Sequence, residues 1–320
     1  MFFPHSRFRR RTLCLVLLPL LGIAACTRSA DRTSASAHVD AIAADTDSFG
    51  APLPSDASFA ARVVSLNPAA TEVIFAMGAQ ASLVGRSKWD EFPAEAKAIM
   101  PVGDGIRPNI EAVLRRHPTL VILYATAENR AAADAFAKAG IRTLTLRVDH
   151  IAQFMSLTRT LGVALGVTER AAQVVDSVQR TLDAVRAATR GARVRRVVWP
   201  LWQQPLLVVG RGSYLDELLE IAGAENVFHD IDAPSPPVNI EEVARREPDA
   251  VVTSVKNIPS LESSMQWRAV RAVREKRFVV SDPELTGRPS VVLGMAAVSL
   301  ARALHPELAA TLPPEPGARR

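Results

Sequence analysis

Two glutamates, Glu111 and Glu241, stand at equivalent places in a motif that occurs twice in this sequence. Residues 108–118 read Pro-Asn-Ile-Glu-Ala-Val-Leu-Arg-Arg-His-Pro, and residues 238–248 read Val-Asn-Ile-Glu-Glu-Val-Ala-Arg-Arg-Glu-Pro. The asparagine of each copy is a good helix N-cap, so each glutamate is predicted in a helix's first turn, where a carboxylate stabilises the helix by about 0.3–1 kcal/mol. Two equivalent anionic points also suit docking onto a partner of pseudo-twofold symmetry, because charge pairing sets orientation and association rate. The two roles are compatible.

Two of the four tryptophans, Trp89 and Trp202, are candidates for covering a flat apolar ligand. Both are predicted in loops beside strands, and charged residues flank Trp89 on each side, which makes a core position less natural. An indole at the mouth of a cleft covers a flat macrocycle with a large area and a small loss of conformational entropy. The alternative is a core or surface anchor, which is the role expected of Trp199 because it lies in a predicted strand.

The sequence carries no motif typical of catalysis or metal binding. No GxSxG, Walker A or GxGxxG motif stands at a predicted strand–helix junction, so no catalytic residues are predicted. The turn at residues 210–213 has glycines but no nucleotide-binding lysine, and Ser213 is predicted to cap the helix that follows. The six histidines form no HExxH or HxH motif and there are two cysteines, so no metal site or disulfide framework is predicted. A binding protein is favoured, with an extracytoplasmic α/β hydrolase and a scaffold lipoprotein as alternatives.

Residues 1–25 are predicted to be an export signal. Arginines at positions 7 and 9–11 form its positive segment and supply four of the net +5 charges, so the basic pI is no argument for a nucleic-acid partner. The apolar run at 13–25 is well short of the ~20 residues that span a bilayer.

Small residues precede Cys26, as in a bacterial lipobox, so Cys26 is predicted to carry lipid. A plain secretory signal with an incidental cysteine and a twin-arginine signal are the alternatives. Residues 26–60 are rich in Ala, Ser, Thr and Asp and are predicted to be a flexible tether. The mature chain is therefore expected outside the cytoplasm, anchored to a membrane.

After the tether, two α/β lobes are predicted over 61–166 and 192–310, followed by a tail at 311–320. Short apolar runs alternate with helical patterns, which indicates parallel sheets. Asp149 is expected to cap the last helix of the first lobe. Between the lobes, Thr168 to Arg190 has apolar residues at helical spacing and no Gly or Pro. Residues 167–191 are therefore predicted to hold one long rigid helix of about 33 Å.

The two lobes also repeat each other at a second place. Residues 72–79 read Glu-Val-Ile-Phe-Ala-Met-Gly-Ala, and residues 217–224 read Glu-Leu-Leu-Glu-Ile-Ala-Gly-Ala. Two matching segments of this kind, aligned without gaps, are typical of a duplicated supersecondary unit. The predicted fold class is α/β, with two Rossmann-like lobes joined by one long backbone helix.

This arrangement resembles the cobalamin and iron-siderophore substrate-binding proteins of ABC importers, which have the class III periplasmic-binding fold with a helical backbone. The resemblance runs through the folded part of the chain and is closest to the cobalamin branch at residues 89–93, where that branch has an aromatic and an acidic residue before Tyr-Pro. The segments that carry it are 62–72, 84–93, 108–123, 210–228 and Arg288-Pro289.

The resemblance implies a monomer that holds a ligand between its lobes and delivers it to a membrane permease driven by a cytoplasmic ATPase. It implies that Glu111 and Glu241 dock onto permease arginines. It also implies that Arg288 lies in the ligand cleft, with Asp104 and Glu284 as weaker candidates, since a guanidinium can clamp carboxylates, amides or phosphate. Cobalamin is expected as the transported ligand, not as a cofactor, and a ferric siderophore is the alternative.

Two departures from the cobalamin branch keep the ligand open. That branch often has a tryptophan before each copy of the Asn-Leu-Glu motif, and residues 103–108 and 234–237 have none. Haem, the third choice, would need an axial His or Tyr in the cleft. The only tyrosines, Tyr124 and Tyr214, are not expected at cleft loops.

Overall fold

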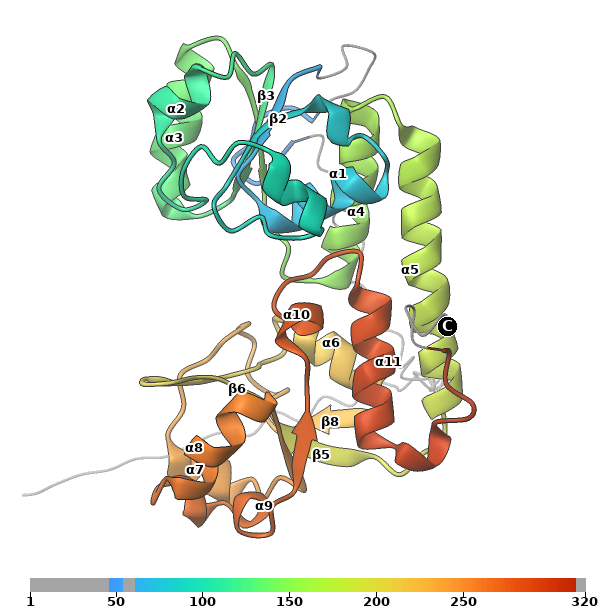
Figure 1. Cartoon of the computed structure of the whole chain (residues 1–320). Helices are drawn as coiled ribbons and strands as arrows, with labels where there is room; N and C mark the ends of the chain where they lie inside the picture. Colours follow the sequence, from blue (N-terminus) through green and yellow to red (C-terminus); the bar gives the residue numbers. More distant parts are fainter. Residues whose placement is uncertain (1–45, 54–60, 315–320) are drawn as a thin grey trace, which may run out of the picture. The chain divides into compact units, whose positions relative to one another are not determined.

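The computed structural model describes residues 46–53 and 61–314 (Figure 1). The predicted signal segment, Cys26 and most of the predicted tether lie outside the described residues, as does the end of the predicted tail. The described residues all belong to one compact unit of the chain.

The first lobe is built on a four-stranded parallel sheet with the order β2-β1-β3-β4. All of β3 is buried except its last residue, because its apolar side chains pack on both faces of the sheet. The strands are β1 (Val63–Ser65), β2 (Leu83–Arg86), β3 (Leu120–Tyr124) and β4 (Arg142–Leu146). The helices are α1 (Pro68–Ala76), α2 (Ile110–Leu114), α3 (Ala127–Lys138) and α4 (Ile151–Ala164), with 3₁₀ turns η1 (Gln80–Ser82) and η2 (Ala94–Ala98).

The second lobe has a four-stranded parallel sheet with the order β10-β9-β5-β8 and a separate antiparallel hairpin, β6-β7. The strands are β5 (Arg195–Val198), β6 (Pro200–Gln203), β7 (Leu206–Val208), β8 (Ala224–Asn226), β9 (Ala250–Thr253) and β10 (Phe278–Val280). The helices are α6 (Tyr214–Ile221), α7 (Ile240–Arg245), α8 (Ile258–Ser263), α9 (Arg271–Arg274), α10 (Pro283–Thr286) and α11 (Leu293–Leu304). Three 3₁₀ turns, η3 (Val255–Asn257), η4 (Trp267–Ala269) and η5 (Pro306–Leu308), complete it.

The two parallel sheets have one topology. With the hairpin set aside, both place their strands in the order second, first, third, fourth along the chain. This duplicated α/β architecture confirms the predicted fold class.

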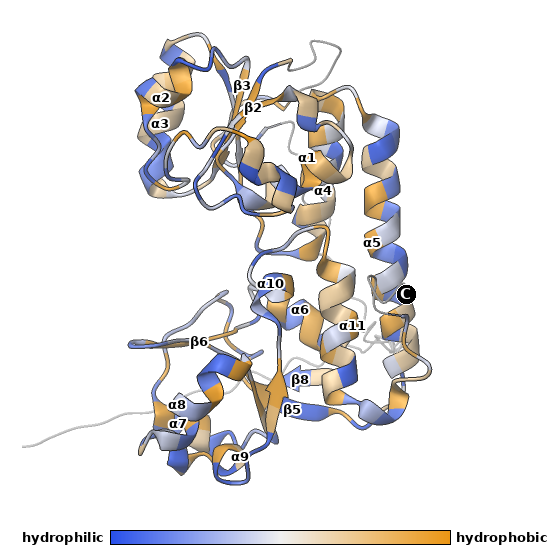
Figure 2. Ribbon diagram, in the orientation of Figure 1, coloured by the Kyte–Doolittle hydropathy of each residue, from blue (hydrophilic) through white to orange (hydrophobic). Residues whose placement is uncertain are grey.

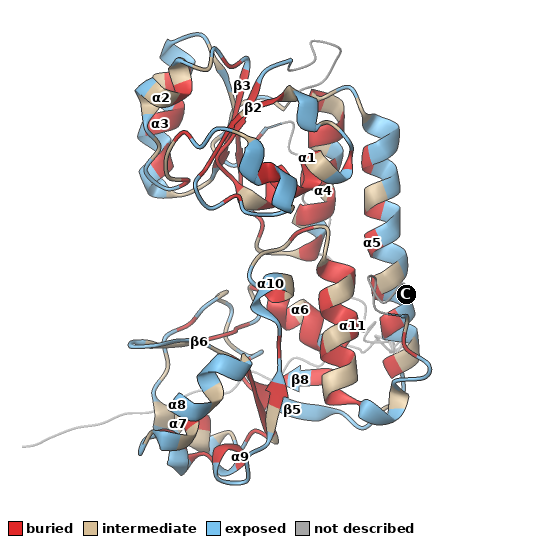
Figure 3. Cartoon of the chain, in the orientation of Figure 1, coloured by how far each residue is buried: buried red, intermediate tan, exposed pale blue. Residues whose placement is uncertain are grey.

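The long helix expected between the lobes is α5 (Thr168–Thr189). It packs against α4 of the first lobe and against α6 and α11 of the second. Its buried side chains form one stripe, while its other faces are polar and exposed, as Figures 2 and 3 show. A continuous helix of this kind resists bending where neither Gly nor Pro interrupts it.

Three groups of buried side chains form the core. The largest joins α5 to one face of each sheet through residues such as Ile122, Leu182 and Val252. The other two cover the opposite face of each sheet separately, and they contain the repeat valines Val113 and Val243, both fully buried. Alternate residues of a strand point to opposite faces, which is why one strand serves two clusters.

The glutamate motifs are a structural repeat as well. Asn109 Oδ1 accepts the Ala112 N–H at 3.0 Å and Asn239 Oδ1 accepts the Glu242 N–H at 2.7 Å, so both predicted N-caps are confirmed. His117 and Glu247, which end the two copies before a proline, both have left-handed backbones, with φ of 47° and 46°.

The predicted cap of α4 is wrong by one residue. His150, not Asp149, is the N-cap. The Gln153 side chain accepts the N–H groups of both residues, at 2.7 Å from Asp149 and 3.1 Å from His150. The Ile151 N–H, at the first residue of the helix, donates instead to Glu217 Oε2 at 3.0 Å, so the start of α4 is capped by Gln153 and by a glutamate of α6 and not by the Asp149 side chain. Ser213, in contrast, caps α6 as predicted.

Candidate ligand-binding site

Trp89 lies in the loop that follows β2, at the carboxyl edge of the first sheet. Ligands of open α/β sheets bind outside this edge. The indole is 61% exposed, and its Nε1–H donates to Asp104 Oδ2 at 3.3 Å. The Lys88 ammonium lies 4.7 Å from the indole ring centroid and 2.9 Å from the same Asp104 oxygen. The structure therefore brings together two of the predicted site residues, Trp89 and Asp104.

The loop that carries Trp89 is held in place by hydrogen bonds to the side chain of Asp90, which is fully buried. Its carboxylate accepts hydrogen bonds from the hydroxyls of Ser87 at 2.5 Å and Thr71 at 2.6 Å. Burial raises the pKa of Asp90, whereas the Ile106 N–H and the Lys88 ammonium hold the pKa of Asp104 far below its usual range. Trp89 is thus an exposed aromatic on a well-fastened loop.

Arg288 lies between α10 and α11 and reaches the first lobe. Its Nε–H donates to Glu72 of α1, whose side chain is 4% exposed, and its guanidinium carbon lies 5.1 Å from the centroid of the Phe92 ring. Glu72 and Phe92 also line a cavity of about 610 Å³ with Val291 and Val292 of the second lobe. Within residues 46–53 and 61–314, the terminal nitrogens of Arg288 have no hydrogen-bond partner, so they can serve a ligand.

Trp202 lies on the β6-β7 hairpin and is 62% exposed. Its Nε1–H donates to Gln204 O, within the hairpin, at 2.9 Å. Gln203 ties the hairpin to the lobe by accepting the Nε1–H of the buried Trp267 at 2.8 Å. No contact between described residues joins Trp202 to Trp89 or Arg288. Glu284 is exposed in the first turn of α10, and no contact between described residues joins its side chain to these groups.

Trp199 lies between β5 and β6 with an exposed fraction of 5%, so of the two roles expected of it, core or surface anchor, the structure shows the core one.

Tyr124 was missed as a site residue. It is the last residue of β3 and 36% exposed, so it lies at the same sheet edge as the Trp89 loop, contrary to the expectation from sequence. The buried Asn129 aligns the two neighbouring segments, because its Nδ2 donates to both Tyr124 O and Gly105 O at 2.8 Å. Burial, followed by the nearby Asp149 carboxylate, raises the pKa of Tyr124. The sequence feature that could have predicted this position is an aromatic residue directly after the apolar run at 120–123. Tyr214, by contrast, donates its hydroxyl to Thr286 O at 2.7 Å.

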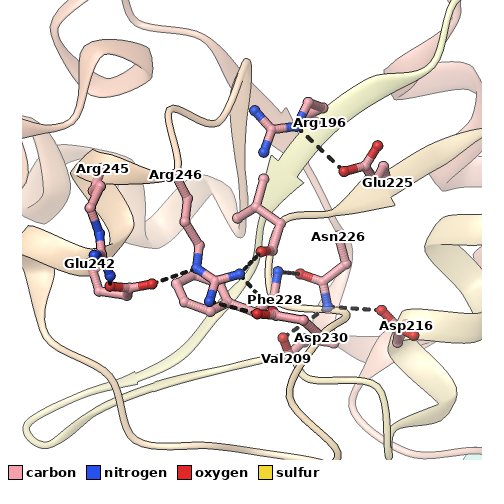
Figure 4. A network of polar contacts seen from close by, with 11 residues as sticks. Arg196, Val209, Asp216, Glu225, Asn226, Phe228, Asp230, Glu242, Arg245 and Arg246 are labelled. Atoms are coloured by element: carbon pink, nitrogen blue, oxygen red, sulfur yellow. Dashed lines mark hydrogen bonds and ion pairs between the residues drawn. The ribbon is translucent and has the colours of Figure 1, made fainter.

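A second cavity, of about 620 Å³, lies beside the edge strand β8 and holds none of the predicted site residues. Its polar side chains pair with one another (Figure 4). Arg246 donates to Glu242 at 2.7 Å and to both oxygens of Asp230 at 2.6 and 2.9 Å, and it lies 4.4 Å from the Phe228 ring centroid. We assign this network to the stability of the second lobe.

The two repeat glutamates are exposed in the first turns of α2 and α7. The Glu111 side chain is 88% exposed, and its ion pair with Arg115, at 3.8 Å, is on the surface. Both carboxylates are therefore accessible to a partner.

In the part of the chain that the structure describes, no group of three His, Cys, Asp or Glu side chains is placed to hold a metal ion. None of the described helices is long and apolar enough to cross a membrane.

A family model described as "Periplasmic binding protein" matches residues 63–285. The chain belongs to this family. Among curated proteins, it is 29% identical over 208 residues to the vitamin B12-binding protein of Salmonella paratyphi A, a match that covers 65% of this chain and 77% of the relative.

Two solved structures share the fold. The periplasmic vitamin B12-binding protein of Vibrio cholerae matches with a TM-score of 0.67 and 22% identity, covering 79% of this chain and 98% of that one. A periplasmic heme-binding protein of Pseudomonas aeruginosa matches with a TM-score of 0.66 and 26% identity, covering 78% and 94%. The family consists of exported substrate-binding proteins that serve ABC importers and bind small molecules; it is not a family of enzymes.

Proposed function

We propose that this periplasmic binding protein captures cobalamin, a corrinoid, in the cleft between its lobes and delivers it to an ABC importer. The observation that carries the proposal is Trp89, an indole that is 61% exposed although the buried Asp90 fastens its loop. An anchored aromatic with most of its surface in water is suited to a partner with a flat apolar face. Similarity to curated vitamin B12-binding proteins supports the same ligand class.

In this proposal each lobe contributes to the ligand. Trp89 with Asp104 covers one face, Trp202 covers the other, and the terminal nitrogens of Arg288 meet the polar rim. Glu284, exposed on α10, is the weakest contributor, because no contact orients its side chain toward the others.

A ferric siderophore is the second candidate, and Arg288 favours it. A guanidinium with unused terminal donors pairs well with the anionic oxygens around ferric iron. Haem is the third candidate. It gains support from Tyr124, a partly exposed phenol at the ligand edge of the first sheet, and from the similarity to a heme-binding protein.

Calorimetry decides among these ligands. We expect cyanocobalamin to release heat on binding and to quench tryptophan fluorescence. No heat and no quenching at high micromolar cyanocobalamin would reject the corrinoid. A ferric siderophore and haem, titrated in the same way, then take its place; haem bound through Tyr124 would show a tyrosinate absorption band that Tyr124→Phe removes.

Delivery is proposed to use Glu111 and Glu241 as docking points for permease arginines. Replacing both with alanine should leave ligand affinity unchanged, because both side chains are exposed in the first turns of α2 and α7 and neither contacts a proposed ligand residue in the described part of the chain. Association with the permease should weaken, since each lobe loses one charge-assisted contact. The readout is stimulation of the transporter's ATPase, and stimulation equal to the wild type's would contradict the docking roles.

Membrane anchoring is proposed through acyl chains on Cys26. Signal, small residues, cysteine and tether follow one another in the sequence in the order that lipoprotein processing requires. Radiolabelled palmitate should enter the wild-type protein and not Cys26→Ala. Equal labelling of the two would show that the cysteine is incidental and the signal a plain secretory one. The anchored protein is expected to act as a monomer.

A further inference from the structure

Two glutamates hold the same position in the sequence repeat, and the side chain of each contacts the other lobe. Glu72 and Glu217 begin the matching segments 72–79 and 217–224, and they lie in the equivalent helices α1 and α6. Glu72 of the first lobe accepts a hydrogen bond from Arg288 of the second. Glu217 of the second lobe contacts His150 and accepts the Ile151 N–H, both on the side of the first lobe, at 2.6 and 3.0 Å.

The partners of these glutamates are equivalent too. Arg288 lies in the connection from β10 to α11, and His150 lies in the connection from β4 to α4. In each sheet this connection follows the fourth strand and leads into a helix that packs against α5. The structure therefore contains two crossed contacts related by the pseudo-twofold symmetry of the lobes.

We propose that Glu72 and Glu217 are matched positioning residues that fix the separation of the lobes before a ligand arrives. Each contacts the other lobe in the segment that connects that lobe's fourth sheet strand to the helix packed against α5. At the Glu217 side, the Tyr214 N–H adds a third tie by donating to Asp149 O at 2.5 Å. At the Glu72 side, the contact uses Nε of Arg288, and no other described residue bonds to its two terminal nitrogens.

The two contacts differ in strength because their surroundings differ. The Glu72 carboxylate is 4% exposed, and Arg288 is covered on one side by Phe92, so water screens this pair little. His150 and Glu217 are 42% and 32% exposed, and that pair is more strongly screened. Loss of Glu72 should therefore loosen the lobes more than loss of Glu217.

The test measures lobe separation directly and needs no ligand, so it is independent of whether the ligand assigned above is right. Spin labels are placed on the full chain at Lys138→Cys of α3 and Lys256→Cys of η3, both exposed, with Cys14 and Cys26, the only natural cysteines, changed to serine. The distance distribution between the labels is then recorded for each variant. Hydrogen exchange of the Ile151 and Tyr214 amides reports the Glu217 side independently.

We expect Glu72→Gln to broaden the distance distribution, Glu217→Gln to broaden it less, and the double variant to broaden it most. Glu217→Gln should also speed exchange at the Ile151 amide. The matched control is Asp183→Asn, which breaks the exposed Asp183–Arg186 ion pair within α5 and should leave the distribution unchanged.

A double variant whose distribution matches the wild type's, even with a lower melting temperature, would overturn the proposal and leave both glutamates with a role in stability alone. If Glu72→Gln does not fold, Arg288→Lys tests the same contact, because lysine keeps the charge but lacks the Nε–H that Glu72 accepts. An unchanged distribution in Arg288→Lys and in Glu217→Gln would also overturn it.

Discussion

The first and second lobes carry the same four-stranded parallel sheet, yet they hold their exposed tryptophans in different ways. Trp89 lies in a loop fixed by Lys88, Asp104 and the buried Asp90. Trp202 lies on the β6-β7 hairpin, and among the described residues its indole bonds to Gln204 O of that same hairpin. The described part of the first lobe has no equivalent of this hairpin between its first strand and first helix. The parallel sheets are therefore duplicated, whereas the two surfaces proposed to face a ligand are built differently in each lobe.

The asparagines, valines and second arginines of the repeated motifs have structural roles in their lobes. The asparagines cap helices and the valines fill the outer cores. The second arginine of each motif donates to a backbone carbonyl at the edge strand of its sheet, Arg116 to Val84 O within β2 and Arg246 to Val227 O directly after β8. A duplicated sequence of this kind preserves structure, and it leaves the choice of ligand to the segments between the repeats.

The largest difference between the lobes should appear at these two arginines. Arg246 also binds Glu242 and Asp230, so Arg246→Met removes two ion pairs and the bond to the Val227 carbonyl. It should cost about 2 kcal/mol of unfolding free energy and no more, because Glu242 keeps its pair with Arg245 and Asp230 is largely exposed. Arg116 makes one such bond, at 2.8 Å, and Arg116→Met should cost about 1 kcal/mol. Urea denaturation followed by circular dichroism measures both losses. Equal losses would show that the polar network of Figure 4 adds nothing to the second lobe.

The two tryptophans test the proposed division of the ligand surface. Trp89→Ala should weaken cobalamin binding about tenfold or more, since a buried aromatic side chain contributes about 1.5–3 kcal/mol. Trp202→Ala should cost less, because the Trp202 indole is bonded to the carbonyl of Gln204 within its own hairpin, and ordering this side chain on the ligand offsets part of the contact. Calorimetry gives both affinities, and Trp199→Phe in the core is the control for a tryptophan that faces no ligand. A larger loss of affinity in Trp202→Ala than in Trp89→Ala would show that Trp202, and not Trp89, contributes more to ligand binding.

The sequence predicted what depends on regular spacing. The α5 helix, the Asn109 and Asn239 caps and the two-lobe α/β class follow from apolar periodicity and capping residues, and the structure agrees with each. The strands β2, β6 and β8 were not predicted, because Gly85, Pro200 and Glu225 interrupt or replace the apolar runs by which the other short strands were found.

The candidate site was predicted less completely, since its parts meet only in three dimensions. The contact of Lys88 with Asp104 and the crossing from Glu72 to Arg288 join residues that no spacing rule relates. Tyr124 was overlooked because its position depends on where β3 ends. Asp90 was read as one of the charged neighbours of an exposed tryptophan, yet it is fully buried beneath that tryptophan's loop.

The smallest predicted effect concerns the two aspartates that hold the Trp89 loop, and it has opposite signs at the two positions. Burial raises the pKa of Asp90 above 3.8, so its protonated form is favoured in the folded state. The stability that Asp90 supplies is then fully present below pH 3.8 and declines as the pH rises through the folded-state pKa. Asp90→Asn should therefore cost less unfolding free energy at pH 7 than at pH 3.

Asp104 is the matched control within the same loop system. The Ile106 N–H and Lys88 lower its pKa, so its contribution to stability is present above pH 3.8 and is lost as the pH falls. Asp104→Asn should then cost more at pH 7 than at pH 3, by a small amount because solvent screens an exposed carboxylate. Denaturant titrations of both variants at the two pH values give the signs. If both variants lost more stability at pH 7 than at pH 3, burial would not raise the pKa of Asp90. The Trp89 loop would then be stabilised by the ionised Asp90 carboxylate and not by a protonated one.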